Sequence, residues 1–295
     1  MTTPAIHWYP GHIAKAEKAL KQQLKLVDVV LEVRDARIPL ATDHAQVREW
    51  VGNKARVLVL NRVDMILPQA RQRWMEWFKA EGEEPYFTDA QHGKGILAVA
   101  QKACLVGVEI NQRRSDRGML PRPVRAVVIG FPNVGKSALI NRLLNRRVVE
   151  SAARPGVTRQ LRWVRISDQL ELLDAPGVIP AKLYDQTAAL KLAICDDIGD
   201  ASYDNQRVAA TLVDLLNHME TAAVGLLPEH SLQSRYKLDS TLVTGEVYLQ
   251  ALAEQRHQGD VERTARELLT DFRKGLLGAI TLELPPSSKF ANFNQ

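Results

Sequence analysis

The sequence has few cysteines and no long hydrophobic run. Its 295 residues include only two cysteines, Cys104 and Cys195, which are far apart and have no second cysteine or histidine pair beside them. This excludes a zinc knuckle and a disulfide scaffold, and it fits a reducing compartment. No stretch reaches the roughly 18 apolar residues of a membrane helix, and the N-terminus lacks the apolar core of a signal peptide. We therefore expect a cytoplasmic protein without a membrane span.

The chain also has no large overall excess of positive or negative charge, but its charges are unevenly distributed along the sequence. The net charge is +5, whereas residues 111–165 contain 13 Lys+Arg and only two acids, Asp116 and Glu150. Residues 184–295 contain 10 basic and 16 acidic residues. A basic block is typical of polyanion binding, although many such blocks are only solvated surface.

Hydrophobic periodicity predicts alternating strands and helices up to about residue 180. Apolar runs at 27–33, 56–60, 86–87 and 124–129 have the length of buried strands, and residues 12–25, 68–81 and 95–106 have helical spacing. Such alternation predicts an α/β fold with a mostly parallel sheet and helices on both faces. The arginine-rich residues 111–123 have no periodicity and are interpreted as a linker.

A second pattern begins after the sheet. A helix is expected from Lys136 to about residue 145, followed by strands at 161–166 and 170–173. Beyond residue 184 only helical patterns remain, with turns near Gly199, Pro228 and Gly259. The prediction is therefore two domains, an α/β domain over residues 1–183 and an all-helical domain over 184–295.

A phosphate-loop pattern, Gly-Phe-Pro-Asn-Val-Gly-Lys-Ser, occupies residues 130–137 between a predicted strand and a predicted helix. Glycines let backbone N–H groups turn toward phosphates, and the helix N-terminus adds partial positive charge. Lys136 is expected on the β- and γ-phosphates and Ser137 on Mg²⁺. A chance glycine turn is the weaker alternative in this context. The nucleotide-binding residues predicted here are Asn133, Val134, Gly135, Lys136, Ser137 and Ala138.

Two further elements follow the phosphate loop in the expected order. Asp174-Ala-Pro-Gly177 comes directly after the predicted strand at 170–173. There Asp174 can hold the Mg²⁺ shell while the Gly177 N–H senses the γ-phosphate. Thr158, in the loop before that strand, is placed to complete the Mg²⁺ sphere. An isolated Asp-x-x-Gly is weak, because such turns are common.

A base-reading element lies upstream of the phosphate loop. Asn61-Arg62-Val63-Asp64 follows the strand at 56–60, and the carboxylate of Asp64 can accept both N1–H and N2–H of guanine. Adenine cannot make that pair of bonds. Thr88-Asp89-Ala90, at the end of the next strand, is the matching position for a backbone N–H to guanine O6.

This order of motifs resembles the circularly permuted GTPases of the translation-factor class. Within it, Trp8-Tyr-Pro-Gly-His12, Asp35-Ala-Arg-Ile-Pro39 and the phosphate loop resemble the ribosome biogenesis GTPase A family. The likeness covers most of residues 6–183 and fades in the C-terminal part. It implies a GTPase that binds the immature large ribosomal subunit and its rRNA, assists a late assembly step and leaves after GTP hydrolysis. We expect a monomer.

The resemblance also implies residue roles. Asn133 would ligate K⁺ beside GTP, and the ion would supply charge where an arginine otherwise acts. His12 would swing toward the γ-phosphate, so the implied catalytic residues are His12, Lys136 and Gly177; a helix-capping role for His12 is the alternative. Val178 would be the family's hydrophobic replacement for a catalytic glutamine. Arg62 stands where the family usually has lysine, and guanine selectivity should survive.

Other functions and RNA contacts stay open at this stage. The alternatives are a small-subunit assembly GTPase and a nucleotide-gated RNA-binding protein with negligible turnover. Arg256, Arg263, Arg266, Arg273 and Lys274 form either one basic face or i,i+4 pairs with nearby acids. Free phosphate contacts are instead expected from the linker and the first helix after the phosphate loop: Arg113, Arg114, Arg117, Arg122, Arg146 and Arg147.

Overall fold

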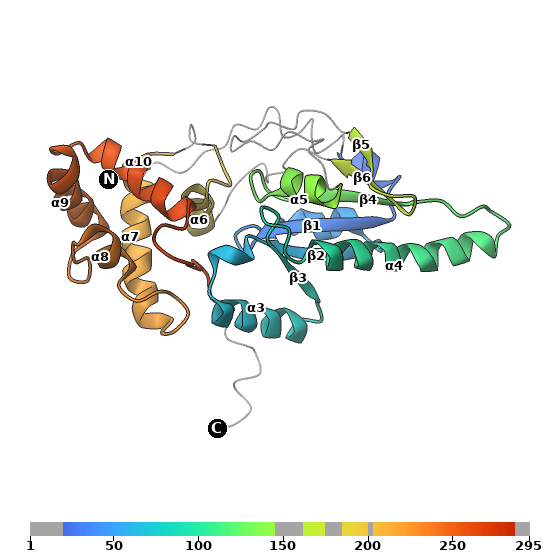
Figure 1. Ribbon diagram of the computed structural model, residues 1–295, viewed down its shortest axis with the longest axis horizontal. Helices are drawn as coiled ribbons and strands as arrows, with labels where there is room; N and C mark the ends of the chain where they lie inside the picture. The colour runs from blue at the N-terminus through green and yellow to red at the C-terminus, as the bar shows by residue number, and fades with distance from the viewer. Residues whose placement is uncertain (1–19, 145–161, 175–184, 200–202, 287–295) are drawn as a thin grey trace, which may run out of the picture.

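A six-stranded sheet forms the centre of the computed structural model, which describes residues 20–144, 162–174, 185–199 and 203–286 (Figure 1). The strand order is β3-β2-β1-β4-β6-β5, and only β5 is antiparallel to its neighbour. The strands are β1 (Val29–Asp35), β2 (Ala55–Asn61), β3 (Pro85–Thr88), β4 (Val124–Ile129), β5 (Arg162–Arg165) and β6 (Leu170–Asp174). The predicted, mostly parallel α/β fold is confirmed.

Helices cover both faces of this sheet because the central strands are apolar on both sides. On one face, Leu31, Val59 and Val128 pack with α4 (Ile96–Ser115) and α5 (Lys136–Leu143). On the other, Val30 and Val127 meet α2 (Ala45–Val51) and the helical residues 20–24, and α3 (Pro68–Ala80) packs on Leu58 and Leu60. Helix α2 was not predicted from the sequence, because it is seven residues long and has too few apolar positions, among them the buried Val47 and Val51, to show a helical period.

Helix α4 is longer than its hydrophobic pattern indicates. It continues to Ser115, so residues 111–115 belong to a helix and the predicted linker begins only after it. Arg113 and Arg114 lie in the last turn, where positive charge is favourable next to the helix dipole. Asn111 then fixes the connection, because its side chain exchanges hydrogen bonds with the backbone of Arg122, at 3.0 and 3.1 Å.

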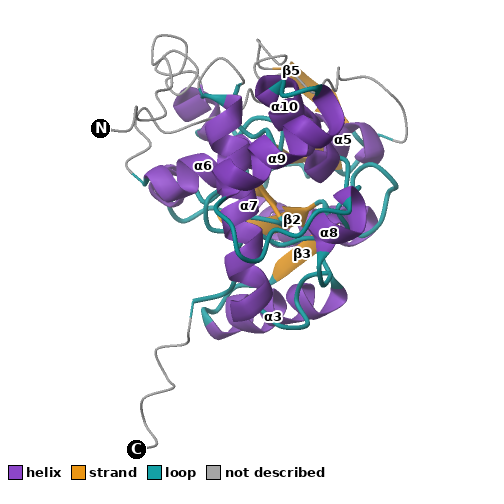
Figure 2. Cartoon of the chain, turned by 90° about the vertical axis from the view of Figure 1, so that its left-hand side faces the viewer, coloured by secondary structure: helices purple, strands orange, loops and turns teal. Residues whose placement is uncertain are grey.

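The C-terminal part contains only helices within residues 185–199 and 203–286, as predicted. They are α6 (Gln186–Cys195), α7 (Asn205–Ala222), α8 (Ser231–Tyr236), α9 (Gly245–His257) and α10 (Val261–Arg273). Helix α7 packs against α9 and α10, and Figure 2 views these helices with strands β2 and β3 behind them. None of the helices in the described residues combines the length and apolar character needed to cross a bilayer.

The five basic residues weighed as one face differ in their surroundings. Arg266 bonds to Glu262 at 2.8 Å, one turn away, and Arg256 lies 3.1 Å from Glu267 on the neighbouring helix. Arg273 turns inward and is only one-fifth exposed, whereas Arg263 and Lys274 are exposed. Of the five, only Arg266 makes an i,i+4 pair, and the inward position of Arg273 interrupts a single basic face.

After α10 the chain returns to the loop that follows β1 (Figure 1). The N–H of Leu282 donates to the Arg37 carbonyl at 2.9 Å. The buried Glu283 carboxylate accepts from the Leu40 N–H at 2.7 Å and pairs with Lys191 of α6 at 3.1 Å. The C-terminal segment therefore joins the helices to the sheet.

Candidate nucleotide-binding site

The predicted site residues gather at one edge of the sheet. Strands β1, β2, β3, β4 and β6 are parallel, so their carboxyl ends lie at the same edge. There Asn61 ends β2, Thr88 ends β3, and the phosphate loop follows β4. Residues that are distant in sequence thus share one site.

Backbone geometry explains the two glycines of the phosphate loop. Gly130 has φ 151° and Gly135 has φ 100°, both rare for side-chain-bearing residues. A Cβ on Gly130 would collide with the Val33 carbonyl oxygen, and one on Gly135 would collide with Asn61 Nδ2. Only glycine lets the loop approach β1 and β2 this closely.

Lys136 holds its ammonium inside this loop. Its Nζ donates to the carbonyl oxygens of Phe131, at 2.7 Å, and Gly130, at 3.3 Å, and the residue is 7% exposed. Ser137 and Ala138 follow in the first turn of α5, both half-buried. A cation enclosed by the loop at a helix N-terminus is suited to phosphate binding.

Asn61 connects the base-reading loops to the phosphate loop. Its Nδ2 donates to the Val134 carbonyl at 2.8 Å. Its Oδ1 accepts from the Thr88 hydroxyl at 3.1 Å and from the Ala90 N–H at 3.0 Å. Every polar atom of this buried side chain is used between the three loops, so Asn61 positions them.

Arg62 and Asp64 lie on the outer side of that connection. Arg62 has a left-handed backbone, with φ 64°, and donates from Nη2 to the Asn133 carbonyl at 2.6 Å. Asp64 is exposed in the short 3-10 turn Val63–Met65, and partial burial, together with the nearby Asp89 carboxylate, raises its pKa. An exposed carboxylate beside the phosphate loop suits a reader of guanine N–H groups.

The loop after β3 is held by its own side chains. Asp89 Oδ1 accepts from the N–H groups of Gln91 and His92, both at 2.9 Å, and Oδ2 lies 2.7 Å from His92 Nδ1. The Asp89 N–H donates to the Lys94 carbonyl. With the Ala90 N–H bonded to Asn61, the amides expected to meet guanine O6 are engaged within the protein. His92 was not predicted; the Asp-x-x-His turn is its only sequence signal.

Several predicted residues fall outside the described part of the chain. They are His12, Thr158 and Gly177. The backbone of Asp174 ends β6 opposite Val128 on β4, which puts this position at the same sheet edge as the phosphate loop. Its side chain, too, lies outside the described residues.

A buried ionic group behind the phosphate loop was not predicted as part of the site. Arg37 and Asp35 pair at 2.7 Å with both side chains fully buried. Burial acts to raise the pKa of Asp35, but attraction to Arg37 and Arg62 outweighs it and the pKa is lowered. Burial, reinforced by Asp35, raises the pKa of the neighbouring Asp197 well above its ordinary value.

The C-terminal end of α6 meets this group and the phosphate loop. Its last carbonyls accept side-chain donors from three directions. Arg273 of α10 donates to Ala193 and Ile194, at 2.8 and 3.0 Å, and Arg37 donates to Cys195 at 3.1 Å. Asn133 Nδ2 donates to the Asp196 carbonyl at 2.7 Å. The phosphate loop is therefore in direct contact with the helical part.

Comparisons with known proteins agree with this arrangement. A family model described as 50S ribosome-binding GTPase matches residues 125–233. Ribosome biogenesis GTPase A of Priestia megaterium is 34% identical over 292 residues, covering 96% of this chain and 98% of that protein. The protein of that name from Bacillus cereus is 35% identical over 286 residues, covering 95% and 94%.

A solved structure supports the fold. The GDP-bound structure of TM YlqF superposes with a TM-score of 0.66 and 22% identity, covering 91% of this chain and all of that one. In the present chain the loops predicted to read guanine precede the phosphate loop in sequence yet meet it through Asn61. This is the circularly permuted form of the P-loop GTPase fold. With its site assembled in that permuted order and its relatives matched along nearly their whole length, the chain is a GTPase that belongs to the ribosome biogenesis GTPase A family.

Proposed function

We propose that this GTPase assists a late step in assembly of the large ribosomal subunit, binding the immature particle with GTP and leaving after hydrolysis. The observation that carries the proposal is the hydrogen bond from Asn133, in the phosphate loop, to Asp196 at the end of α6. It gives the nucleotide site a direct mechanical link to the helices. The description of the matching family model, a 50S ribosome-binding GTPase, favours the large over the small subunit.

Within this proposal each loop has a chemical task. Asp64 accepts the guanine N1–H and N2–H, Arg62 lays its stem over the base plane, and Lys136 neutralises the β- and γ-phosphates. His12, Thr158 and Gly177 are assigned to the γ-phosphate side on the family resemblance. We also propose a cytoplasmic monomer, with the division between sheet and helical domains near residue 183.

The described residues fit the two ions that the family uses. Ser137 presents a hydroxyl in the first turn of α5, directly after Lys136, where Mg²⁺ would meet the phosphates. Asn133 commits its Nδ2 to Asp196, so Oδ1 is the atom it can offer to K⁺. When bound, the cations supply positive charge to the transition state of phosphoryl transfer.

The potassium assignment has a direct test. GTP hydrolysis should be faster in KCl than in NaCl at equal ionic strength, and Asn133→Gly should abolish the difference. Glycine accepts the φ of 57° at this position, so the variant removes the oxygen without straining the loop. Loss of such a charge contact typically lowers the rate ~100-fold or more. Equal rates in both salts for the unmutated protein would discard the K⁺ role.

Sedimentation with purified ribosomal subunits tests partner and switch together. The protein is incubated with a GTP analogue, with GDP or without nucleotide. Each sample is then sedimented with immature large subunits or with small subunits. We expect co-sedimentation with large subunits in the analogue and release in GDP. Binding that favours small subunits, or that ignores the nucleotide, would refute the proposed function.

RNA contact is proposed mainly for the end of α4 rather than for the helical domain. Arg113 is about three-quarters exposed and only 3.9 Å from Glu109, an ion pair too solvated to hold it. The expectation that Arg122 is a free phosphate contact was wrong, because its guanidinium donates two hydrogen bonds to the Asp28 carboxylate, at 2.7 and 2.8 Å. Arg146 and Arg147 lie outside the described residues.

The salt dependence of subunit binding tests this assignment. Each lost phosphate contact should flatten the logarithmic salt slope by about 0.7 to 0.9. Changing Arg113, Arg114 and Arg117 to glutamine should therefore flatten it more than changing Arg263, Arg266 and Lys274. A larger effect from the second set would place the RNA contact on the helical domain instead.

A further inference from the structure

Trp163 is the most exposed tryptophan, tyrosine or phenylalanine in the described part of the chain. It lies on β5, the antiparallel strand at the edge of the sheet, and is 38% exposed. Its strand neighbour Val164 is buried at 6%, so β5 is seated firmly by its other face. A single exposed aromatic ring is common on protein surfaces, so the case for a binding role depends on the groups beside it.

Two arginines lie beside the ring on the same face of the sheet. The register pairs Trp163 with Leu173, Arg165 with Glu171, and Glu171 with Arg125 of β4, so both arginines lie in the row of residues next to that of Trp163. The Arg125 guanidinium lies over the indole, 5.6 Å from its centroid. Arg165, two residues from Trp163, is 63% exposed. The surface thus offers an aromatic ring with two neighbouring cations.

The acids near these arginines do not neutralise them firmly. Arg165 bonds to Asp168 at 3.0 Å, but Asp168 is 98% exposed. Arg125 lies 3.5 Å from Glu171, with 42% of the arginine exposed. Pairs so open to water contribute little and exchange readily for a phosphate group.

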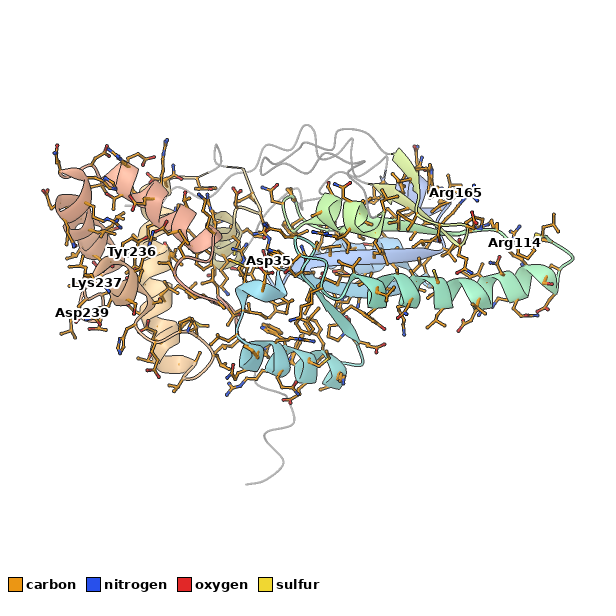
Figure 3. The ribbon with its side chains drawn as sticks, viewed as in Figure 1. Asp35, Arg114, Arg165, Tyr236, Lys237 and Asp239 are labelled. Atoms are coloured by element: carbon orange, nitrogen blue, oxygen red, sulfur yellow. The ribbon has the colours of Figure 1, made fainter. Side chains whose placement is uncertain are left out.

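The arginines of this surface lie farther from the phosphate loop than the tryptophan does. Arg125 is the second residue of β4, and Gly130 follows the end of that strand, whereas Trp163 pairs with Leu173, directly before Asp174. Figure 3 shows Arg165 and Arg114, at the end of α4, toward the same end of the molecule, with Asp35 near the middle and Tyr236 at the other end. A ligand here would extend the proposed RNA contact of α4.

We propose that Trp163 stacks on an unpaired base of RNA while Arg125 and Arg165 hold the flanking phosphates. The inference rests on the proposed function for its biological partner. Every base has a flat π-face, so an exposed indole binds unpaired bases with little sequence preference. Tryptophan and arginine are also enriched at protein interfaces, so a protein partner is the competing outcome of the test. RNA is favoured because all three residues lie in the strongly basic stretch 111–165.

Binding of a fluorescently labelled strand of about ten adenosines to the full-length protein tests the inference. Trp163→Ala should weaken binding on the order of 5- to 150-fold, the range expected for one stacked base, at an unchanged salt slope. Trp163→Phe should lose less. Arg165→Gln should instead flatten the slope by about 0.7, the value for one phosphate of a single strand. An RNA duplex should show no dependence on Trp163.

Matched measurements separate stacking from general damage. Leu242→Ala removes a side chain that is 94% exposed on the helical part and should change nothing. Trp163→Ala should keep cooperative urea unfolding and GTP binding, because the buried Val164 and Leu173 that hold β5 in place are unchanged. Single-strand binding that is absent, or independent of Trp163, would overturn the inference.

The ribosomal measurement then distinguishes the two proposals. If Trp163→Ala weakens sedimentation with large subunits yet keeps single-strand affinity, the surface binds a protein and the inference fails. If the unmutated protein ignores subunits while Trp163 still governs single-strand binding, the proposed function fails and the stacking surface stands.

Discussion

Asp197 is a fully buried carboxyl whose two oxygens have no hydrogen-bond partner among the described residues. It lies beside the Asp35–Arg37 pair, and burial followed by repulsion from Asp35 raises its pKa well above the ordinary value. A carboxyl with a raised folded-state pKa adds stability that is fully present below its unfolded pKa. That stability is lost as the pH rises through the folded-state pKa.

Asp197→Asn should therefore flatten the dependence of stability on pH. One proton bound only in the folded state contributes a slope of about 1.4 kcal/mol per pH unit, and the amide removes it. The free energy of unfolding in urea, measured from about pH 5 to about pH 9, should fall less steeply in the variant. Asp168→Asn, at a position 98% exposed, is the control. Identical slopes would mean that Asp197 is ionised in the folded protein.

Asp64 gives a second prediction at the scale of one residue. Its exposed carboxylate is the proposed acceptor for guanine N1–H and N2–H. Asp64→Asn should weaken GTP and strengthen xanthosine triphosphate, because the amide donates to the carbonyl that xanthine carries in place of the N2 amine. Competition binding of the two nucleotides measures the exchange. Equal affinity of the unmutated protein for ATP and GTP would contradict the assignment.

The last carbonyls of α6 accept hydrogen bonds from side chains of three other segments. Helix carbonyls in the last turn lack intrahelical partners, and here Arg273, Arg37 and Asn133 supply them. Arg273 also donates to the Tyr203 hydroxyl at 2.8 Å. The helix end is thus the place where α10, the loop after β1 and the phosphate loop are held together.

Arg273→Gln should loosen that helix end. Hydrogen bonds to a charged donor contribute about 1.5 to 3 kcal/mol, so unfolding in urea should occur at clearly lower denaturant. Amide hydrogen exchange should rise at residues 193–197. Arg266→Gln breaks only an exposed pair within α10 and should change stability by less than about 0.5 kcal/mol. Equal effects of the two changes would remove the special role of the α6 terminus.

Elements and loops differ in how far the sequence predicts them. Buried strands such as β2 were predictable, because an apolar run ending at a polar Asn61 has few other solutions. The extension of α4 was not, since its last residues are polar and are fixed by Asn111 bonding to Arg122. The bond from Asn61 to Val134 joins positions 73 apart, and no local pattern carries such information. For the same reason the sequence could not predict that the Ala90 N–H donates to Asn61 Oδ1.

At the scale of the whole molecule, the Glu283 carboxylate joins the C-terminal segment to the loop after β1 and to α6. Burial raises its pKa, although Lys191 partly offsets the effect. Glu283→Ala would leave the Leu40 and Ala41 amides without their acceptor. We expect a loss of about 1 to 3 kcal/mol in the free energy of unfolding, the cost of unsatisfied buried donors. Glu283→Gln, which retains one acceptor oxygen, should lose less.

Thermal and urea unfolding measure this contribution. Glu229→Ala, on an exposed turn of the helical part, is a suitable control. If Glu283→Ala matches that control, the C-terminal segment adds nothing to the union of sheet and helices.

The contact of residues 281–282 with Arg37 also limits how early this part of the chain can fold during synthesis. The hydroxyl of Thr281 and the N–H of Leu282 both donate to the carbonyl of Arg37, which is made 244 residues before Thr281. At the usual elongation rates of about 5 to 20 residues per second, the ribosome needs roughly 12 to 50 s to cover that interval. The loop after β1 therefore exists for that whole interval without the two donors that bind its Arg37 carbonyl, and this part of the core can form only after Thr281 and Leu282 have been synthesised.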